Sequence, residues 1–457
     1  MSEKKKTLLL LMVAVATFVD GLDGSIVSII LPSISTDFGV DTSTVSWIST
    51  VYFLLVAGFM FIFGKLSDMG HIKKVFVSGL IIFTTGSLFC GLSLNFTMLI
   101  ISRSIQAIGA SMLASSALML CVIHLPMKIL NFAVSVVVLG SASGFAAGPA
   151  IGGVLTSMQS WHWTFIINVP IGIILTFIAL YTIPKDKASN EKFDIVGAIL
   201  LLISLTLGLY VLQTIPSNTI STSIAVITIS SLLTFVWFII HCKRTTEPII
   251  NLDLFNCINL NAAIIVCLLM NACYMGMQYI IPFYSEKMFG FNPIISGLYL
   301  SIPAVITLPM CIFVGKISDK LNERRLFTFI GCVVMLMEMI LMLTVKENSE
   351  RWPLVIALIL MGIQFGIAGG PVGARIIYNT PEKLRNTGSA ITSFVAYFGS
   401  AFGIAVFSGA FKFGAGSIVG FQELTIPNFM NGLYSSMFIG IIISFISLLL
   451  TSIKDKD

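Results

Sequence analysis

Apolar residues along this chain are gathered in long runs that carry almost no charge. A helix needs about 20 apolar residues to cross the hydrocarbon core of a bilayer, and the runs have about this length. The connections between them are short, and none offers room for a soluble domain. The sequence therefore predicts fourteen spanning helices, at residues 7–31, 45–66, 75–94, 97–119, 131–156, 163–183, 195–214, 221–241, 259–284, 295–315, 326–345, 353–376, 388–411 and 431–452.

The composition supports an all-α polytopic membrane protein. Of the 457 residues, 56% are hydrophobic and only 10% are charged. A soluble domain carries about 25% charged residues, so this chain lacks the charge to cover a water-soluble surface. The 35 phenylalanines and a mean hydropathy of +0.99 exclude a disordered chain.

The beginning of the chain has the look of a signal peptide, because Lys4, Lys5 and Lys6 precede an apolar run. The run continues to about residue 31, however. It contains Asp20 and Asp23 and lacks a small-residue cleavage site. We therefore expect it to be the first membrane helix.

The placement of Lys and Arg predicts the orientation. If the spans alternate from a cytoplasmic N-terminus, only Lys287, Lys346, Arg351 and Lys412 fall outside the cell, and Arg103 lies within a span. All the other basic residues fall on the cytoplasmic side. We therefore expect a multi-pass protein of the plasma membrane, with an even number of spans and both termini in the cytoplasm.

The chain also repeats itself. The pentapeptide Gly64–Asp68 at the end of the second span returns as Gly315–Asp319 at the end of the tenth, an offset of 251 residues. The same offset brings spans 1–5 onto or near spans 9–13. The sequence thus predicts a six-helix bundle over residues 1–183, two inserted helices over residues 184–258 and a second six-helix bundle over residues 259–457. Two inserted helices return the chain to the same side, so the repeats are parallel, as they are in major facilitator transporters.

Five motifs occur in order along matching spans. They are residues 22–32, similar to the pattern LDxTIVNVALP; Gly64, Leu66, Asp68, Lys73 and Lys74, similar to GxLaDrxGrk; Arg103–Gly109, similar to RxxQGxG; Gly140–Gly153, similar to GxxxGPxxGG; and Trp161–Trp163 with Asn168–Gly172, similar to WRW…NxPxG. The second motif departs from its pattern at Met69, His71 and Ile72. Together the motifs resemble the major facilitator superfamily, specifically its fourteen-helix drug:proton antiporter branch, and the resemblance extends over essentially the whole chain.

Three charged residues within spans are candidates for proton coupling and substrate binding. Asp23 lies deep in the first span, with Asp20 one turn earlier on the same face. A charge at membrane depth costs about 2.5–3.5 kcal/mol on insertion scales, and burial of a carboxyl group favours its protonated form. Asp23→Asn is therefore expected to abolish proton-driven export. The resemblance implies that Arg103 lies near the proton path. The alternative for all three is a structural role in ion pairs and hydrogen bonds between helices.

Small residues in the fifth span form the motif that the resemblance assigns to antiporters. Gly140, Gly144 and Gly148 share one helix face, and Pro149 favours a bend. A hinge that biases antiport and ordinary close helix packing both remain open. The full set is Gly140, Gly144, Gly148, Pro149, Gly152 and Gly153.

The two copies of the repeated pentapeptide are candidates for a gating latch at the cytoplasmic ends of spans 2 and 10. The residues concerned are Gly64 and Asp68 in the first copy and Gly315 and Asp319 in the second. Basic residues follow each copy and provide charges that such a latch could use. The alternative is a solvated loop that merely follows the positive-inside rule.

Polar residues in the second repeat give two further candidates. Asn271, Tyr274 and Gln278 share one face of span 9, which corresponds to span 1. They either line a substrate cavity or form hydrogen bonds between helices. Glu338 in span 11 is an acid at membrane depth, with a transport role and a structural role both open.

The sequence lacks the motifs of an enzyme or of an ATP-driven pump. It contains no Walker A, HExxH or GxSxG sequence, and none of its eight cysteines has metal-ligand spacing. We expect no enzyme activity, no cofactor, no metal and no nucleic-acid partner.

The resemblance implies a proton-coupled efflux transporter for small molecules in the lipid bilayer, exporting amphipathic drugs or toxic compounds of the quaternary-ammonium type by alternating access. The first alternative is a dedicated exporter of one metabolite, peptide, lipid or tetracycline-like compound. A membrane scaffold or sensor that no longer transports is a second alternative.

Overall fold

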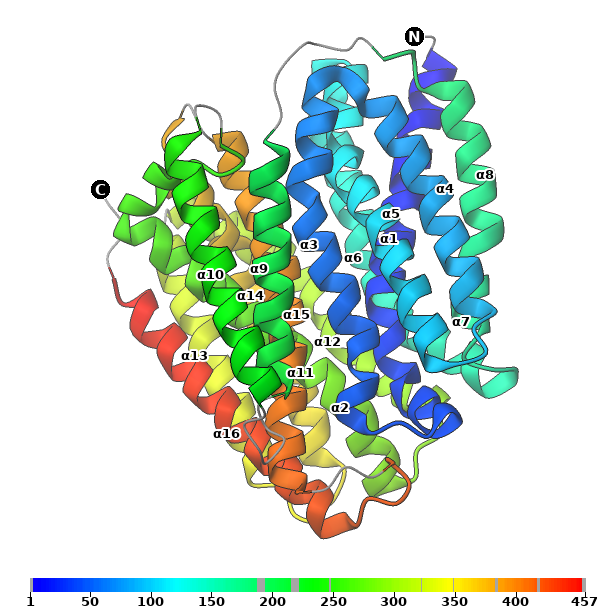
Figure 1. Ribbon diagram of the computed structural model, residues 1–457, viewed down its shortest axis with the longest axis vertical. Helices are drawn as coiled ribbons and strands as arrows, with labels where there is room; N and C mark the ends of the chain where they lie inside the picture. The colour runs from blue at the N-terminus through cyan, green and yellow to red at the C-terminus, as the bar shows by residue number, and fades with distance from the viewer. Residues whose placement is uncertain are drawn as a thin grey trace.

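The computed structural model describes residues 3–186, 194–214, 222–245, 248–321, 323–347, 349–382, 385–416 and 420–453, and every regular element in them is a helix (Figure 1). The elements are α1 (Glu3–Phe38), α2 (Thr42–Val45), α3 (Trp47–Leu66), the π-helical turn η1 (Ser67–His71), α4 (Ile72–Gly91), α5 (Phe96–His124), α6 (Met127–Met158), α7 (Trp163–Ile166), α8 (Asn168–Thr182), α9 (Ile195–Thr214), α10 (Thr222–Arg244), the 3-10 turn η2 (Leu252–Asn256), α11 (Ile258–Phe289), α12 (Pro293–Leu321), α13 (Arg324–Leu343), α14 (Trp352–Asn379), α15 (Arg385–Ala415) and α16 (Ile426–Thr451).

Thirteen segments of the described chain are long and apolar enough to cross a membrane. The longest, Thr42–Gly91, contains both α3 and α4, which η1 joins without a break. They are nevertheless two helices, because the chain turns at Gly70, whose φ is +84°. With α3 and α4 counted separately, the described residues contain the fourteen spans that the sequence predicts. The all-α polytopic fold class is confirmed.

The internal repeat has a second marker in the backbone. Gly39 follows α1 and Gly290 follows α11, and each has a φ of +61°. Glycine adopts this left-handed conformation without the cost that a Cβ atom would add. The two positions are 251 residues apart, which is the offset found in the sequence.

The two halves of the molecule meet along two pairs of helices. We call residues 1–183 the first half and residues 259–457 the second half. Helix α3 packs on α15, and α6 packs on α12, so each pair joins one helix from each half. Under the repeat, α3 corresponds to α12 and α6 to α15, so the two contacts are equivalent. Helix α1 also contacts α11 and α12 across the halves, less extensively than the two main pairs do.

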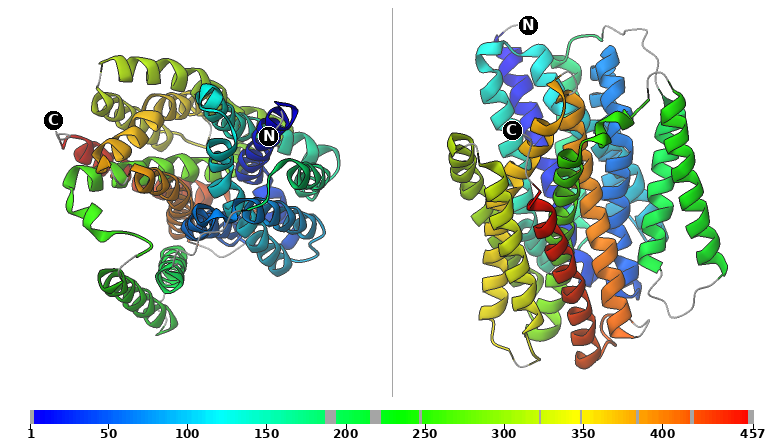
Figure 2. Two further views of the ribbon diagram at one scale, coloured as in Figure 1. Left: turned by 90° about the horizontal axis from the view of Figure 1, so that it is seen from above. Right: turned by 90° about the vertical axis from the view of Figure 1, so that its left-hand side faces the viewer.

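The inserted helices α9 and α10 form a hairpin at the edge of the molecule (Figure 2). Helix α9 packs on α3 and α15, whereas α10 packs mainly on α9 and has few fully buried residues. The Gln213 side chain of α9 donates a hydrogen bond to the carbonyl of Ser43, 3.1 Å away. The hairpin thus lies along one of the two seams. The domain limits at 184 and 258 stay a prediction.

Candidate functional site

Asp23 lies at the centre of a fully buried hydrogen-bond network in the first half. Its Oδ2 accepts from Nη1 of Arg103 at 2.6 Å. Its Oδ1 accepts from Nε2 of Gln106 at 2.8 Å and from Nδ2 of Asn168 at 3.1 Å. Helices α1, α5 and α8 therefore meet at one carboxylate, and the charge of Asp23 is balanced by Arg103.

A second layer of contacts holds Arg103 and Gln106 in place. Gln106 accepts from Arg103 at 2.6 Å and donates to the Ser87 hydroxyl at 2.7 Å. The guanidinium carbon of Arg103 lies 3.9 Å from the centre of the Tyr52 ring. Both contacts fix the direction in which the guanidinium points, because it is planar and its donors form a rigid fork.

Asp20 lies in a different environment from Asp23. Its Oδ2 accepts a hydrogen bond from the Tyr397 hydroxyl at 3.1 Å, and the Tyr52 hydroxyl lies 3.5 Å from Oδ1. Tyr397 belongs to α15, so the first of these bonds joins the two halves. The two acids that the sequence places on one face of α1 thus have separate roles in the structure.

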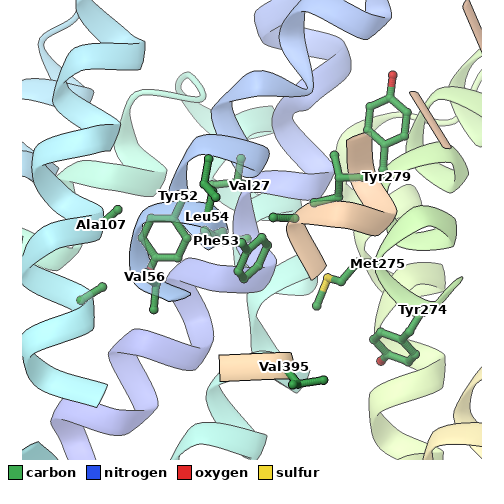
Figure 3. Packing of buried hydrophobic residues seen from close by; sticks show 14 of the residues in the cluster. Val27, Tyr52, Phe53, Leu54, Val56, Ala107, Tyr274, Met275, Tyr279 and Val395 are labelled. Atoms are coloured by element: carbon green, nitrogen blue, oxygen red, sulfur yellow. The ribbon is translucent and has the colours of Figure 1, made fainter. Parts of the chain in front are cut away.

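A cavity of about 490 Å³ lies between the halves, and Asp20 is part of its wall. Helices α1, α3, α5 and α6 line it from one side and α11, α12, α14 and α15 from the other. Among its described lining residues, Asp20 is the only charged one. Aromatic side chains supply much of the remaining wall. Figure 3 shows Tyr52 and Phe53 of α3 and Tyr274 of α11, and the others are Phe145 of α6, Phe365 of α14 and Tyr397 of α15.

The three polar residues predicted to share one face of α11 do not all have the same surroundings. Asn271 and Tyr274 line the cavity, although the Asn271 amide also donates to the carbonyl of Cys267 at 2.8 Å. Gln278 is buried outside the cavity wall, where its Oε1 lies 3.5 Å from the Ser28 hydroxyl of α1. The first two side chains therefore face the cavity, whereas Gln278 connects the halves, and a role of any of the three in substrate binding stays a prediction.

The glycine stripe of α6 faces α1. A Cβ atom at Gly144 would collide with the carbonyl oxygen of Phe18, and one at Gly140 would lie 2.7 Å from the carbonyl of Ala14. Gly148 and Gly152 continue the same contact toward Ser25 and Ile26. The four glycines therefore bring α6 close to the helix that carries both acids.

The end of the predicted motif reaches the second half instead. A Cβ atom at Gly153 would collide with the carbonyl of Pro293, and one at Gly297 with the carbonyl of Pro149. Both Pro149 and Gly153 therefore belong to the seam between α6 and α12. The equivalent of the glycine stripe in the second half is Gly399 and Gly403, which approach α11 at Leu268 and Ala272.

The residues predicted to form a latch lie at the ends of α3 and α12. Asp68 is exposed, and its side chain has an interaction partner. A Cβ atom at Gly64 or at Gly315 would meet nothing within 4 Å. These two glycines therefore have no packing role in this conformation. The side chain of Asp319 lies outside the described part of the chain.

Several residues of the buried network were quoted in motifs but were not predicted as site residues. Gln106 is part of the Arg103 motif, and Asn168 begins the Asn168–Gly172 motif. Their motif positions were the available signal. Tyr397 had no comparable signal, because only the fold brings α15 next to α1.

The chain belongs to the Major Facilitator Superfamily, whose family model matches residues 13–404. It is 29% identical over 413 residues to the riboflavin transporter RibZ of Clostridioides difficile, with 89% of each chain covered. It is 25% identical over 400 residues to the "Putative multidrug resistance protein MdtD" of Escherichia coli K12, with 86% of this chain and 84% of that protein covered.

The solved structures that resemble this one are transporters as well. A bacterial homologue of the human lysosomal transporter Spinster aligns with a TM-score of 0.73 at 14% identity, covering 99% of this chain and 97% of that one. A D-xylose–proton symporter aligns with a TM-score of 0.66 at 14% identity, covering 96% and 97%. These likenesses confirm the fold. The protein is a multi-pass membrane transporter of this superfamily rather than an enzyme, and its substrates are small molecules.

Proposed function

We propose that the protein is a proton-coupled exporter of amphipathic aromatic compounds, cationic ones foremost, and that Asp20 is the group shared by proton and substrate. The observation that carries this proposal is the cavity wall, in which Asp20 is the only charged residue among those described. An anionic substrate would be repelled by such a wall, whereas a cation would find a carboxylate and several aromatic rings.

The physical basis of the coupling is the cost of an uncompensated charge. A carboxylate removed from water is expensive unless a proton or a cation neutralises it. Two tyrosine hydroxyls stabilise the charged form of Asp20 only in part, since each is a neutral donor. A proton and a cationic substrate therefore compete for the same carboxylate, which is the requirement for exchange.

The proposal gives Asp23 a different role from Asp20. Because Arg103 already balances its charge, Asp23 fixes the wall behind the cavity. Tyr52 connects the two sites, since its ring stacks on Arg103 and its hydroxyl faces Asp20. A change in the charge of Asp20 is transmitted along this contact to the ion pair.

The size and chemistry of the cavity favour broad recognition. Ligand sites for drug-sized molecules enclose about 300–1,000 Å³ and are mostly apolar with a few polar groups. The volume of about 490 Å³ lies within this range. Aromatic rings attract cations through their faces, so planar aromatic cations fit the wall best. The similarity to a multidrug resistance protein supports export as the direction.

The cycle would proceed by alternating access between the two halves. The double seam of α3 with α15 and α6 with α12 gives the surfaces on which the halves rock. In this proposal, Gly64, Asp68, Gly315 and Asp319 form the latch that closes the cytoplasmic side. The open space beside Gly64 and Gly315 is consistent with a conformation in which the latch is released.

The experiment uses purified protein in proteoliposomes loaded at a different pH from the bath, with ethidium as the cationic probe. We expect ethidium to move against its gradient when protons move in the opposite direction, and to stop when an ionophore removes the pH difference. Ethidium movement that is independent of the pH difference would contradict the proposal.

The similarity to a riboflavin transporter favours a second candidate, a dedicated transporter of one neutral planar compound. The aromatic wall suits such a compound as well, because stacking needs no charge. The two candidates differ in breadth. If riboflavin is transported and none of a panel of aromatic cations is, the dedicated role replaces the multidrug role.

A further inference from the structure

Glu338 is a buried acid in a described span that the proposed cycle does not use. It lies on α13 and is fully buried. Neither of its carboxylate oxygens has a hydrogen-bond partner. A charged carboxylate in this position would have neither a cation nor a donor among the described residues, which makes the charged form costly.

Among the described residues, none with a charge is seen to pair with Glu338. Helix α11 contributes Cys273 and Tyr274, which interact with it electrostatically. Helix α16 has one titratable side chain, Tyr434, and its hydroxyl donates to the carbonyl of Val345. On α14, Arg375 interacts with Cys332, nearer the beginning of α13.

The rest of α14 and helix α12 complete the surroundings of α13. The remaining titratable side chain of α14, Tyr378, stacks on Arg324 at 4.2 Å, at the beginning of α13. Helix α12 touches α13 only lightly, and its titratable residues are Tyr299, Cys311, Lys316, Asp319 and Lys320. Of these, Cys311 interacts with Tyr274.

A second orphaned polar side chain lies in the same helix interface. Gln364 of α14, which packs on α13, is fully buried, and its amide oxygen and nitrogen both lack partners. Its neighbour Phe365 stacks on Tyr274 with 4.8 Å between ring centres. Both Phe365 and Tyr274 line the cavity. The unpaired groups thus lie directly behind the wall that the second half gives to the cavity.

The repeat relates this region to the Asp23 network. Helix α13 begins 252 residues after α4, and the two pentapeptides are 251 residues apart. Under the repeat, Glu338 therefore corresponds to Gly86 or Ser87 of α4. The Ser87 hydroxyl accepts a hydrogen bond from Gln106, which also donates to Asp23. Asp23 itself corresponds to Tyr274. In the first half the acid Asp23 is on α1, which lines the cavity. In the second half the acid Glu338 is on α13, which packs behind the cavity-lining helix α14.

We propose that Glu338 is a second proton-binding site, loaded in this conformation and discharged when the second half rearranges and brings donors such as the Gln364 amide to its oxygens. The proposal rests on the proposed proton coupling for its role in transport. Tyr274 of α11 and Phe365 of α14 stack on each other in the cavity wall, and they connect the helices around Glu338 with the substrate cavity. Two acids, one in each half, would then exchange protons during one cycle.

Infrared spectroscopy of the purified protein in lipid nanodiscs tests the site without substrate. The wild type is expected to show a protonated carboxyl band at the high frequency typical of an unbonded group. The band should shift in D₂O and be absent from Glu338→Gln. If Glu338→Gln does not fold, Glu338→Asp should keep the band at an altered frequency. Absence of the band from the wild type, or no shift in D₂O, overturns the proposal.

Transport in proteoliposomes tests the role of the site. At equilibrium the accumulation of ethidium rises with a power of the proton gradient equal to the protons exchanged per cation. We expect this power to fall by one in Glu338→Gln while ethidium still binds. An unchanged power overturns this inference alone. A wild type whose accumulation does not depend on the gradient overturns the proposed function, and the infrared measurement still decides the site.

Discussion

Arg103 and Asp23 form an ion pair of 2.6 Å in which both side chains are shielded from solvent. The pair leaves Asp23 with a balanced charge. Asp20, one turn away on α1, faces the cavity, and its hydrogen-bond partners among the described residues are two tyrosine hydroxyls. Sequence position alone favours Asp23 as the exchange group. The structure places Asp20, and not Asp23, in the wall of the cavity.

Asp20→Asn should remove proton-driven accumulation of cations while the protein still folds. The amide keeps the shape of the side chain but can hold neither a proton nor a cation. The loss of a charged contact of about 1.4–3 kcal/mol corresponds to a tenfold or greater loss of cation affinity. Ethidium binding and uptake into proteoliposomes measure this effect. Riboflavin binding is the control, since a neutral compound does not need the charge, and equal losses for both compounds would count against the role of Asp20.

Tyr397→Phe should weaken cation binding or its coupling to the pH gradient more than Tyr52→Phe does. The Tyr397 hydroxyl is 3.1 Å from Asp20 and comes from the other half, whereas the Tyr52 hydroxyl is 3.5 Å away. The Tyr52 ring under Arg103 is unchanged in Tyr52→Phe, so this variant is a matched control. Transport of ethidium at a fixed pH difference measures both. A larger defect in Tyr52→Phe would contradict the bridging role of Tyr397.

Breaking the Arg103–Asp23 pair should destabilise the first half. Removal of one partner leaves a buried charge without compensation, at a cost of about 3–5 kcal/mol. Asp23→Asn and Arg103→Gln should each lower the melting temperature strongly and abolish export. The double variant should recover much of the stability, because it buries no charge. Additive losses in the double variant, measured by thermal unfolding in detergent, would show that the pair is not coupled.

Gly144→Ala should destabilise the contact between α1 and α6. The added Cβ would collide with the Phe18 carbonyl, which belongs to the backbone and cannot move aside. Overpacking of this kind costs about 1–3 kcal/mol. Gly370→Ala on α14 is the control, because nothing lies within 4 Å of its Cβ position. The expected order of thermal stability is Gly144→Ala below wild type, with Gly370→Ala equal to wild type or above it.

Asp194 should anchor the α9–α10 hairpin in a pH-dependent way. Burial acts to raise the pKa of Asp194, but hydrogen bonds from the Gly197 amide, the His241 ring and the Ile249 amide outweigh it and hold the pKa below 3.8. A lowered folded-state pKa gives stability that is present above the ordinary value and is lost as the pH falls below it.

Asp194→Asn should therefore speed amide hydrogen exchange in residues 222–245 at neutral pH, and in the wild type the same exchange should accelerate only as the pH falls below about 4. His241→Ala should have a smaller effect, because the two amide donors are retained. Equal exchange in the wild type and in Asp194→Asn would show that the anchor contributes nothing.

The fold could be predicted from the sequence to a large extent, because a bilayer imposes one requirement on every span. Length and apolarity identify the fourteen helices, and the pentapeptide at Gly64 and Gly315 identifies the repeat. The helices run a few residues beyond the apolar runs: α1 begins at Glu3 and the first run at residue 7. Backbone hydrogen bonding continues into the interface, where hydropathy gives no signal.

The division between Asp20 and Asp23 could not be predicted, because it depends on which helices meet α1. A spacing of three residues places both acids on one side of α1, but only the packing of α5 and α8 brings Arg103 and Asn168 to Asp23. Tyr397 lies 377 residues from Asp20 along the chain. The contact depends on the arrangement of the two halves, which no local pattern encodes.

Proton release on substrate binding tests the central claim most directly. Purified protein in weakly buffered solution is mixed with ethidium, and the pH change is followed in the wild type, in Asp20→Asn, and in the double variant of Asp23→Asn with Arg103→Gln. The account predicts proton release in the wild type, its loss in Asp20→Asn, and its retention in the double variant to the extent that this variant folds. Undiminished release from Asp20→Asn would contradict the claim that proton and substrate share this carboxylate.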